Sequence, residues 1–294
     1  MPNSLIAVTI TPLSYVVSAV TTYTFAITVR NPLILGGGVR ITLPADLYMP
    51  TGNCSATASS TYGGSIGTST NCLVTTNSST TYIFVTNIFS ATFPTNTTFN
   101  LAVSNILNPI SAKQTATFTF QTYYSSSELV NPVDDSTQLT GLTVLPVAAT
   151  ITLGNFAITR SSTTNMQYAV YNIKYVVTSK FNANGYLTIS FPTYMIMSSP
   201  SVCNFTVQST TNVTTSSQTI IPTATTASTY LLTFNFSSLI TTDLAAGTTI
   251  TITITSLRNY YSFKPVYSQL ITYSSDGYAV EQSGATDVQL TNTV

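Results

Sequence analysis

The chain has 294 residues, of which 8 are basic and 8 acidic, so only 5% are charged and the net charge is zero. A nucleic-acid surface is excluded, because phosphate binding needs clustered Lys and Arg and the chain has no such cluster. Ser and Thr account for 94 residues, yet a disordered stalk is excluded as well, since 44% of the residues are hydrophobic.

The first half of the chain predicts short strands separated by turn residues. Large apolar residues alternate with small polar ones, which is the period-2 pattern of a strand with one buried face. Gly36-Gly37-Gly38 lies between two such segments and predicts a turn, not a phosphate-binding loop. Residues 51–81 are small and polar and predict a long loop or a weak edge hairpin. The predicted strands are 7–11, 23–29, 39–43, 82–85, 97–103, 115–122 and 142–145.

The second half repeats this order after Pro146, which marks the join. Tyr171–Val177 matches Tyr23–Val29, and Asn184-Gly185 predicts a tight turn before the next strand. Residues 249–254 alternate Thr and Ile and give the clearest strand pattern in the chain. The predicted strands are 149–153, 171–177, 186–191, 203–208, 230–236, 249–254 and 265–272.

One repeated phrase indicates the domain organisation. Val39-Arg40-Ile41-Thr42-Leu43-Pro44 returns as Leu187-Thr188-Ile189-Ser190-Phe191-Pro192, 148 residues later. The proline has no N–H to donate, so it ends strand pairing in both copies. The sequence therefore predicts an all-β fold of two tandem immunoglobulin-like (Greek-key) β-sandwich modules, residues 1–145 and 146–294. The chain has no Trp, so true immunoglobulin membership is not predicted.

Three cysteines are present. Cys54 and Cys72 lie 18 residues apart in one module, and this spacing across a glycine-bearing loop predicts a disulfide. Cys203 takes the place of Cys54 in the second module but has no partner near the place of Cys72. It is either buried and free or bonded to a second chain. A catalytic thiol would need a base beside it, and the chain contains no His.

The sequence predicts no enzyme, no cofactor and no metal site. The absence of His excludes the usual zinc, copper and Ser–His–Asp sites. Glycoside hydrolysis would need two acids in a lined cleft, and the eight acids fall mostly on loops. Glu128, Asp134-Asp135 and Asp243 could line a Ca²⁺ site, but no Asp-x-Asx-x-Asx loop is present. A solvated face is therefore the preferred interpretation of these acids.

A neutral surface of low charge density does little to keep copies of a chain apart. A coat of N- or O-linked glycans would do so. We therefore expect an extracellular chain, processed or cut from a longer array, because neither a secretory leader nor a membrane span is recognisable. Six Asn-x-Ser/Thr sequons predict N-glycosylation at Asn53, Asn77, Asn96, Asn204, Asn212 and Asn235.

The tyrosines divide into two groups. Tyr171 and Tyr175 lie in an alternating segment and are predicted in a core or on a sheet face. The neighbouring pairs Tyr123-Tyr124 and Tyr260-Tyr261 must each turn at least one ring toward solvent if their backbone is extended. An exposed ring is useful at a protein contact, and ordinary loop packing is the alternative.

An alternating strand, a Pro and a trailing Cys recur in Leu43-Pro44…Cys54 and Phe191-Pro192…Cys203. This phrase resembles the tandem β-sandwich repeats of long Ser/Thr-rich extracellular surface and filament glycoproteins of ciliates and other protists. Archaeal thread and pilus subunits that exchange a strand are similar in composition. The resemblance implies an extracellular structural or adhesive role and supplies no catalytic residue.

We therefore predict a structural subunit of an extracellular glycosylated filament or sheath, whose partners are other copies of itself. Its terminal strands are expected to be unused at the free ends and to join copies head to tail. The alternative is a cell-surface adhesin that binds a glycan or protein receptor through exposed loops, and a secreted hydrolase is a weaker third possibility. The predicted assembly residues are Ala7, Val8, Ile10, Val288 and Leu290.

Overall fold

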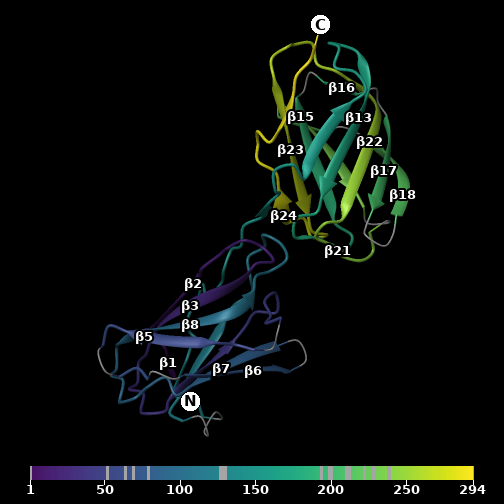
Figure 1. The fold of residues 1–294 in the computed structure, drawn as a ribbon. Helices are drawn as coiled ribbons and strands as arrows, with labels where there is room; N and C mark the ends of the chain where they lie inside the picture. The colour runs from purple at the N-terminus through teal and green to yellow at the C-terminus, as the bar shows by residue number, and fades with distance from the viewer. Residues whose placement is uncertain are drawn as a thin grey trace. The chain divides into compact units, whose positions relative to one another are not determined.

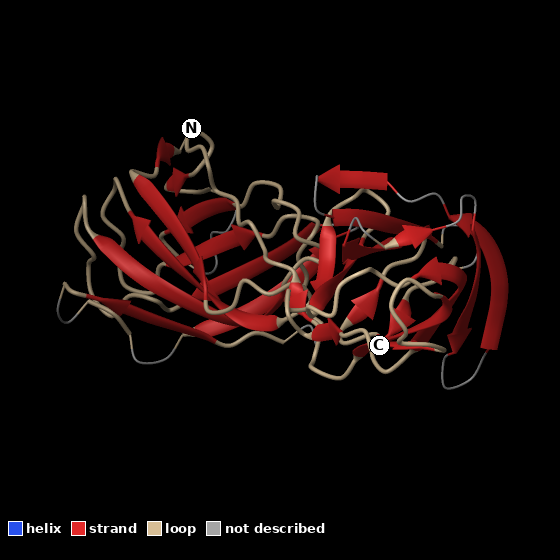
Figure 2. Ribbon diagram, turned by 90° about the horizontal axis from the view of Figure 1, so that it is seen from above, coloured by secondary structure: helices blue, strands red, loops and turns tan. Residues whose placement is uncertain are grey.

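The chain is all-β, as predicted. In the computed structural model of the protein, every regular element of the described residues is a β-strand (Figure 2). Side chains are described except at residues 192, 196–197, 201–230 and 256. The structure describes residues 2–50, 53–62, 65–67, 70–77, 80–125, 131–192, 195–197, 201–208, 213–220, 223–226, 229–236 and 240–293.

The strands form two compact units. Unit 1 contains residues 1–109 and 113–146, and unit 2 contains residues 110–112 and 147–294. Each unit is an immunoglobulin-like sandwich, because consecutive strands move between two sheets in Greek-key order. Figure 1 labels most of these strands in chain order.

Unit 1 is built from a six-stranded and a four-stranded sheet. The six-stranded sheet has the order β1 (Asn3–Ser4), β10 (Asp134–Asp135), β9 (Thr119–Tyr123), β4 (Gly38–Thr42), β7 (Thr80–Thr86) and β6 (Asn71–Asn77). The four-stranded sheet has the order β2 (Ala7–Pro12), β3 (Val20–Thr28), β8 (Thr98–Leu107) and β5 (Ala56–Ser60).

Unit 2 has two large sheets and one two-stranded ribbon. The first sheet has the order β11 (Ala149–Thr150), β24 (Ala279–Gln282), β23 (Val266–Tyr273), β15 (Tyr186–Pro192), β20 (Thr229–Asn235) and β19 (Thr223–Thr226), and β25 (Val288–Leu290) also pairs with β23. The second has the order β12 (Phe156–Arg160), β13 (Tyr168–Val176), β22 (Thr249–Arg258), β17 (Ser201–Gln208) and β18 (Val213–Ile220), with β16 (Ile196–Met197) on β22. The ribbon joins β14 (Lys180–Phe181) to β21 (Leu244–Ala245).

The strand orders of the two units correspond, apart from β14, β16, β18, β21 and β25, which only unit 2 has among the described strands. In each unit the first short strand pairs in parallel, β1 with β10 and β11 with β24, before the chain enters the other sheet. The repeated phrase forms β4 and β15, and each lies between two antiparallel neighbours. Interior strands need alternating side chains that fill a core, which is why this phrase carries the strongest pattern.

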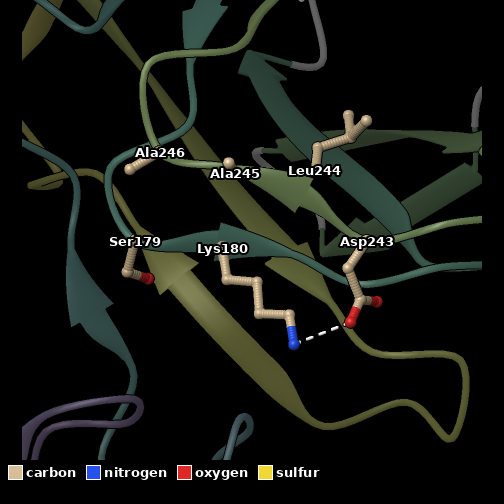
Figure 3. A pocket seen from close by; sticks show the side chains of 6 residues that line it. All are labelled: Ser179, Lys180, Asp243, Leu244, Ala245 and Ala246. Carbon is tan, nitrogen blue, oxygen red and sulfur yellow. Dashed lines mark ion pairs between the residues drawn. The ribbon is translucent and has the colours of Figure 1, made fainter.

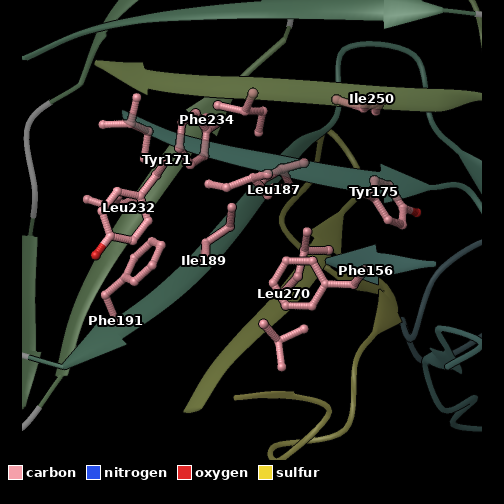
Figure 4. Packing of buried hydrophobic residues seen from close by; sticks show 14 of the residues in the cluster. Phe156, Tyr171, Tyr175, Leu187, Ile189, Phe191, Leu232, Phe234, Ile250 and Leu270 are labelled. Carbon is pink, nitrogen blue, oxygen red and sulfur yellow. The ribbon is translucent and has the colours of Figure 1, made fainter. Parts of the chain in front are cut away.

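The alternating side chains meet in a core inside each sandwich. In unit 2, Ile250, Ile252 and Ile254 of β22 are fully buried, while the threonines between them lie on the other face. Tyr171 and Tyr175 of β13 are buried with them, as predicted (Figure 4). Burial of one such side chain contributes roughly 1.5–3 kcal/mol, so these strands supply much of the stability of unit 2.

Two predicted segments differ in the structure. Within residues 51–81 the expected edge hairpin is present in part, because β6 pairs with β7 at the edge of the six-stranded sheet, but β5 pairs with β8 in the other sheet. Small side chains such as Ala56 and Ala58 face the core there, so the sequence shows little contrast between the two faces. Residues 142–145 form no strand, although Leu142 and Val144 are buried and their carbonyls accept bonds from Phe118 and Thr115.

Candidate functional site

A buried carboxylate holds the turn that follows the second long strand of each unit. Asp134 accepts the backbone N–H groups of Arg30 and Asn31, each at 3.1 Å, and the Asn31 side-chain amide at 2.6 Å. Asp134 is 0% exposed, so the solvated-face interpretation is wrong for it. The reason is that the turn after β3 packs against this carboxylate and donates three hydrogen bonds to it.

Glu281 of β24 does the same in unit 2 and is also 0% exposed. Its carboxylate accepts the Tyr175 hydroxyl at 2.5 Å and the backbone N–H groups of Thr178 and Lys180, each at 3.1 Å. Ser179 donates both its N–H and its hydroxyl to the same carboxylate. These carboxylates are saturated with hydrogen bonds from the protein, so their role is structural.

A surface depression in unit 2 lies over the two-stranded ribbon (Figure 3). It has a volume of about 290 Å³ and is open to solvent. The ammonium of Lys180 lies 2.6 Å from a carboxylate oxygen of Asp243, and Figure 3 shows the two side chains pointing toward each other. Burial alone would raise the pKa of Asp243, but bonds from Lys180 and from the Ala183 N–H outweigh it and lower the pKa. The two charges match each other, so the residues that line the depression carry no net charge.

A second candidate is a partly buried polar network at one end of unit 2. The guanidinium of Arg160 donates to the side-chain oxygens of Asn259 at 3.3 Å and Asn292 at 2.8 Å, and to the carbonyl of Thr291 at 2.7 Å. The Tyr171 hydroxyl donates to the same Asn259 oxygen at 2.5 Å. Burial raises the pKa of Tyr171, and the nearby Arg160 opposes that shift.

The two asparagines use their amide N–H groups to hold the surrounding loops. Asn259 donates to the carbonyls of Ser162 and Thr164, at 3.0 and 2.7 Å. Asn292 donates to the carbonyls of Tyr260, at 2.5 Å, and Ser262, at 3.3 Å. Three chain segments far apart in sequence are thereby fixed side by side.

Together these segments, residues 161–168, 258–265 and 291–293, form what we call the aromatic platform. Four large side chains on it are exposed: Met166 by 46%, Tyr168 by 50%, Tyr261 by 62% and Phe263 by 51%. The platform is tied directly as well, because Asn165 donates its amide to the Tyr261 carbonyl at 2.9 Å. Exposed rings on loops that are held so firmly are typical of a contact surface.

Unit 1 contains only part of this arrangement. Tyr23 donates to Asn108 at 2.6 Å, and Asn108 donates to the carbonyls of Ser14 and Val16 at 2.8 Å each. Pro12 pairs with Tyr23 where Arg160 pairs with Tyr171, so unit 1 has no guanidinium at this position. The platform network is therefore an addition to a pattern that both units share.

The structure confirms the predicted disulfide between Cys54 and Cys72, whose Cα atoms are 5.7 Å apart. Cys54 precedes β5 and Cys72 lies in β6, so the bond links edge strands of the two sheets of unit 1. Cys203 lies in β17, where the side chains are not described, so its state stays open. The tyrosine pairs follow the prediction, since Tyr123 and Tyr260 are buried while Tyr124 and Tyr261 are exposed.

Four of the six predicted sequons have exposed asparagines, namely Asn53, Asn77, Asn96 and Asn235. Asn204 lies in β17, whose side chains are not described, and Asn212 and Glu128 lie outside the described residues. Glycosylation stays a prediction. Within the described ranges no group of three or more His, Cys, Asp or Glu side chains could hold a metal ion. The described residues also contain no helix long and apolar enough to span a bilayer.

The terminal strands are not unused, which corrects the expectation. Ala7, Val8 and Ile10 belong to β2, which pairs with β3 along its whole length. Val288 and Leu290 belong to β25, which pairs with β23, and both side chains are buried in the core. The reason is that each terminal segment completes the sandwich of its own unit. Each of the two strands keeps one unpaired edge, since among the described strands β2 pairs only with β3 and β25 only with β23.

No known protein-family profile matches the chain, and no curated protein sequence matches it either. Among solved structures, the chain is similar to the C-terminal domain of the BspA antigen I/II polypeptide of Streptococcus agalactiae, with 9% identity, a TM-score of 0.33 and coverage of 92% of this chain and 93% of that one. It is also similar to the corresponding domain of AspA from Streptococcus pyogenes, with 8% identity, a TM-score of 0.33 and coverage of 95% of this chain and 94% of that one. The collagen-binding domain of RspB from Erysipelothrix rhusiopathiae is similar with 12% identity, a TM-score of 0.29 and coverage of 98% of this chain and 94% of that one. Similarity at these TM-scores carries no argument for function.

Sequence reasoning missed Arg160, Asn259 and Asn292. One signal was present in the sequence repeat. Tyr23 and Tyr171 are 148 residues apart, and an asparagine directly follows a later strand of each unit, Asn108 after β8 and Asn259 after β22. The bonds of Arg160 to Asn259 and Asn292, and of Asn259 to Ser162, span 97 to 132 residues in sequence, so periodicity cannot reveal them.

Proposed function

We propose that the chain is a pair of non-catalytic extracellular modules of the adhesin class, and that it binds its ligand through the aromatic platform of unit 2. One observation carries the proposal. Arg160, Asn259 and Asn292 fix three loops while Tyr261 and Phe263 remain exposed on them. Core packing would bury these rings, so the network stabilises a surface and not the core.

Rigidity gives this surface an energetic advantage in binding. Ordering a flexible side chain or loop at an interface costs about 0.5–1.5 kcal/mol for each immobilised side chain. Loops that are fixed before binding avoid much of that cost. The disulfide and the exposed sequon asparagines support an oxidising, extracellular compartment for such a contact.

The test is a binding comparison on glycan and protein arrays. Tyr261→Ser combined with Phe263→Ser removes two exposed rings without touching the buried network. We expect at least a roughly tenfold loss of affinity for whatever ligand the parent protein captures. The matched control is Leu13→Ser with Tyr15→Ser, two exposed residues on the unit 1 loop whose carbonyls Asn108 holds. Equal binding by parent and platform variant would rule out the platform as the ligand site.

Filament assembly is a second proposal, supported by the free edge of β2. Leu13 donates its N–H to the Thr22 carbonyl, so by alternation the N–H groups of Val8 and Ile10 point away from β3. An edge of this kind can accept a strand from another copy. Pro12 at the end of β2 has no N–H and limits the length of such a contact.

Val8→Pro tests this second proposal, because it removes one outward N–H and keeps the bonds of β2 to β3. Val8→Ala removes similar packing and keeps the N–H, so it is the matched control. If β2 joins copies, electron micrographs should show fibres for the parent and for Val8→Ala but not for Val8→Pro. Fibres of unchanged repeat from all three proteins would exclude the β2 edge as the joint.

A further inference from the structure

The charges on the aromatic platform have one sign. Residues 161–168, 258–265 and 291–293 contain Arg258 and Lys264 but no Asp or Glu. Within the described residues neither side chain forms an ion pair, and the Arg258 guanidinium contacts the Met166 sulfur at 3.3 Å. With Arg160 beneath the loops, three of the eight basic residues of the chain gather here. Such a surface favours an anionic partner.

The remaining side chains of the platform are rings and small polar groups. Tyr168, Tyr261 and Phe263 offer exposed aromatic surface, and hydroxyl and amide groups surround them, on residues such as Thr163 and Gln167. Aromatic side chains combine a large apolar area with little conformational freedom, and a few polar groups then fix the orientation of a ligand. This combination suits a ligand with both apolar faces and many hydroxyl groups.

The backbone of the platform is already occupied. Asparagine side chains bind the carbonyls of Ser162, Thr164, Tyr260, Tyr261 and Ser262. A peptide that adds as a strand needs a row of unpaired backbone groups, and these loops do not supply one. Recognition must therefore rest on side chains, which favours a sugar over an extended peptide.

We infer that the ligand of the aromatic platform is an acidic glycan, whose carboxylate or sulfate groups meet Arg258 and Lys264 while its sugar rings lie against Tyr261 and Phe263. This inference rests on the proposed adhesin function and specifies its ligand class. Bonds between cations and carboxylate or sulfate oxygens are among the stronger hydrogen bonds, so the two cations set the selectivity.

The experiment is calorimetric titration of the whole chain with oligosaccharides of chondroitin sulfate, heparin and polysialic acid. The neutral comparison is the chondroitin sulfate oligosaccharide after desulfation and carboxyl reduction. We expect at least one acidic oligosaccharide to bind, and the neutral form to bind at least about tenfold more weakly. Affinity should also fall as salt rises from about 50 to about 500 mM, because exposed charge pairs are screened.

Variants then locate the site. Lys264→Gln should weaken the acidic ligand several-fold, and Arg258→Gln with Lys264→Gln should abolish its advantage over the neutral form. Lys113→Gln, the counterpart of Lys264 in the first half of the chain, should change nothing, and thermal unfolding checks that every variant is folded.

Each contrary result has its own meaning. Equal binding of the neutral oligosaccharide, lost in Tyr261→Ser with Phe263→Ser, overturns the acidic-glycan inference and leaves the adhesin function standing. Tighter binding of the acidic peptide hexaglutamate than of any glycan overturns the inference in favour of a peptide ligand. A failure of all three acidic oligosaccharides to bind also overturns the inference. If the Tyr261 and Phe263 variant captures its ligands as the parent does, the proposed function itself fails.

Discussion

At the scale of single residues, the buried polar groups of this protein are mostly uncharged. Tyr23 with Asn108 and Tyr171 with Asn259 repeat one arrangement, in which a hydroxyl fixes an amide and the amide fixes a loop. A buried amide with all its partners avoids the desolvation penalty of a charge. A chain with so few charged residues can therefore still specify the positions of its loops.

Glu281, Asp134 and Asp135 are the exceptions, and the first two give a first prediction. Glu281→Gln and Asp134→Asn each replace an acceptor-only carboxylate by an amide whose N–H₂ would face donors. We expect each change to lower the free energy of unfolding of its unit by about 1.5–3 kcal/mol. Urea denaturation measures this, with Asp46→Asn, an exposed acid, as the control expected within about 0.5 kcal/mol of the parent. A control that costs as much as the two buried changes would refute the explanation.

The buried tyrosines predict a loss of stability in alkali. Burial raises the pKa of Tyr23, Tyr171 and Tyr175 above the ordinary value. Above about pH 10 the unfolded chain loses these phenolic protons while the folded chain keeps them, so stability must fall as the pH rises further. Below that pH both states are protonated and the contribution is constant. Tyr23→Phe should lower stability at neutral pH but flatten the alkaline slope in urea titrations; an unchanged slope would contradict this account.

At the scale of elements, the two faces of β22 differ in burial. Ile252 is fully buried, whereas the neighbouring Thr251 lies on the outer face. Ile252→Ala should lower the free energy of unfolding of unit 2 by about 2–5 kcal/mol, because it removes buried methyl groups and leaves a cavity. Thr251→Ala in the same strand should cost less than about 1 kcal/mol. Chemical denaturation of both variants tests the assignment, and similar losses would mean that the two faces are not distinct.

The same contrast explains how much of the fold the sequence predicts. Strands with large apolar residues on one face, such as β4, β15 and β22, are recognisable from periodicity alone. Strand β5 has only Ala and Ser on its inner face, and its pairing with β8 is fixed by contacts distant in sequence. One part of the aromatic platform can be predicted from the sequence, because neighbouring residues of an extended segment face opposite ways and Tyr261 is exposed where Tyr260 is buried. The Arg160 network cannot be predicted in this way, because it depends on three loops that meet only in the folded chain.

At the scale of the whole molecule, two compact units with separate cores should unfold in separable steps. The disulfide lies entirely in unit 1. Cys54→Ser with Cys72→Ser should therefore destabilise unit 1 by about 3 kcal/mol, through the larger conformational entropy of the unfolded loop. Scanning calorimetry should show one transition shifted to lower temperature and the other unchanged. A shift of both transitions would mean that the two units do not unfold independently.

The disulfide also has a mechanical consequence when the chain is stretched. Cys54 and Cys72 close a segment of 18 residues that a stretching force cannot extend while the bond is intact. When unit 1 is unfolded by force, the released contour length should be shorter by roughly 60 Å, at about 3.3–3.6 Å per residue. Reducing agent should restore that length in single-molecule extension. Because the bond joins the edges of both sheets, the two faces of unit 1 would stay tethered to each other even after its core has ruptured.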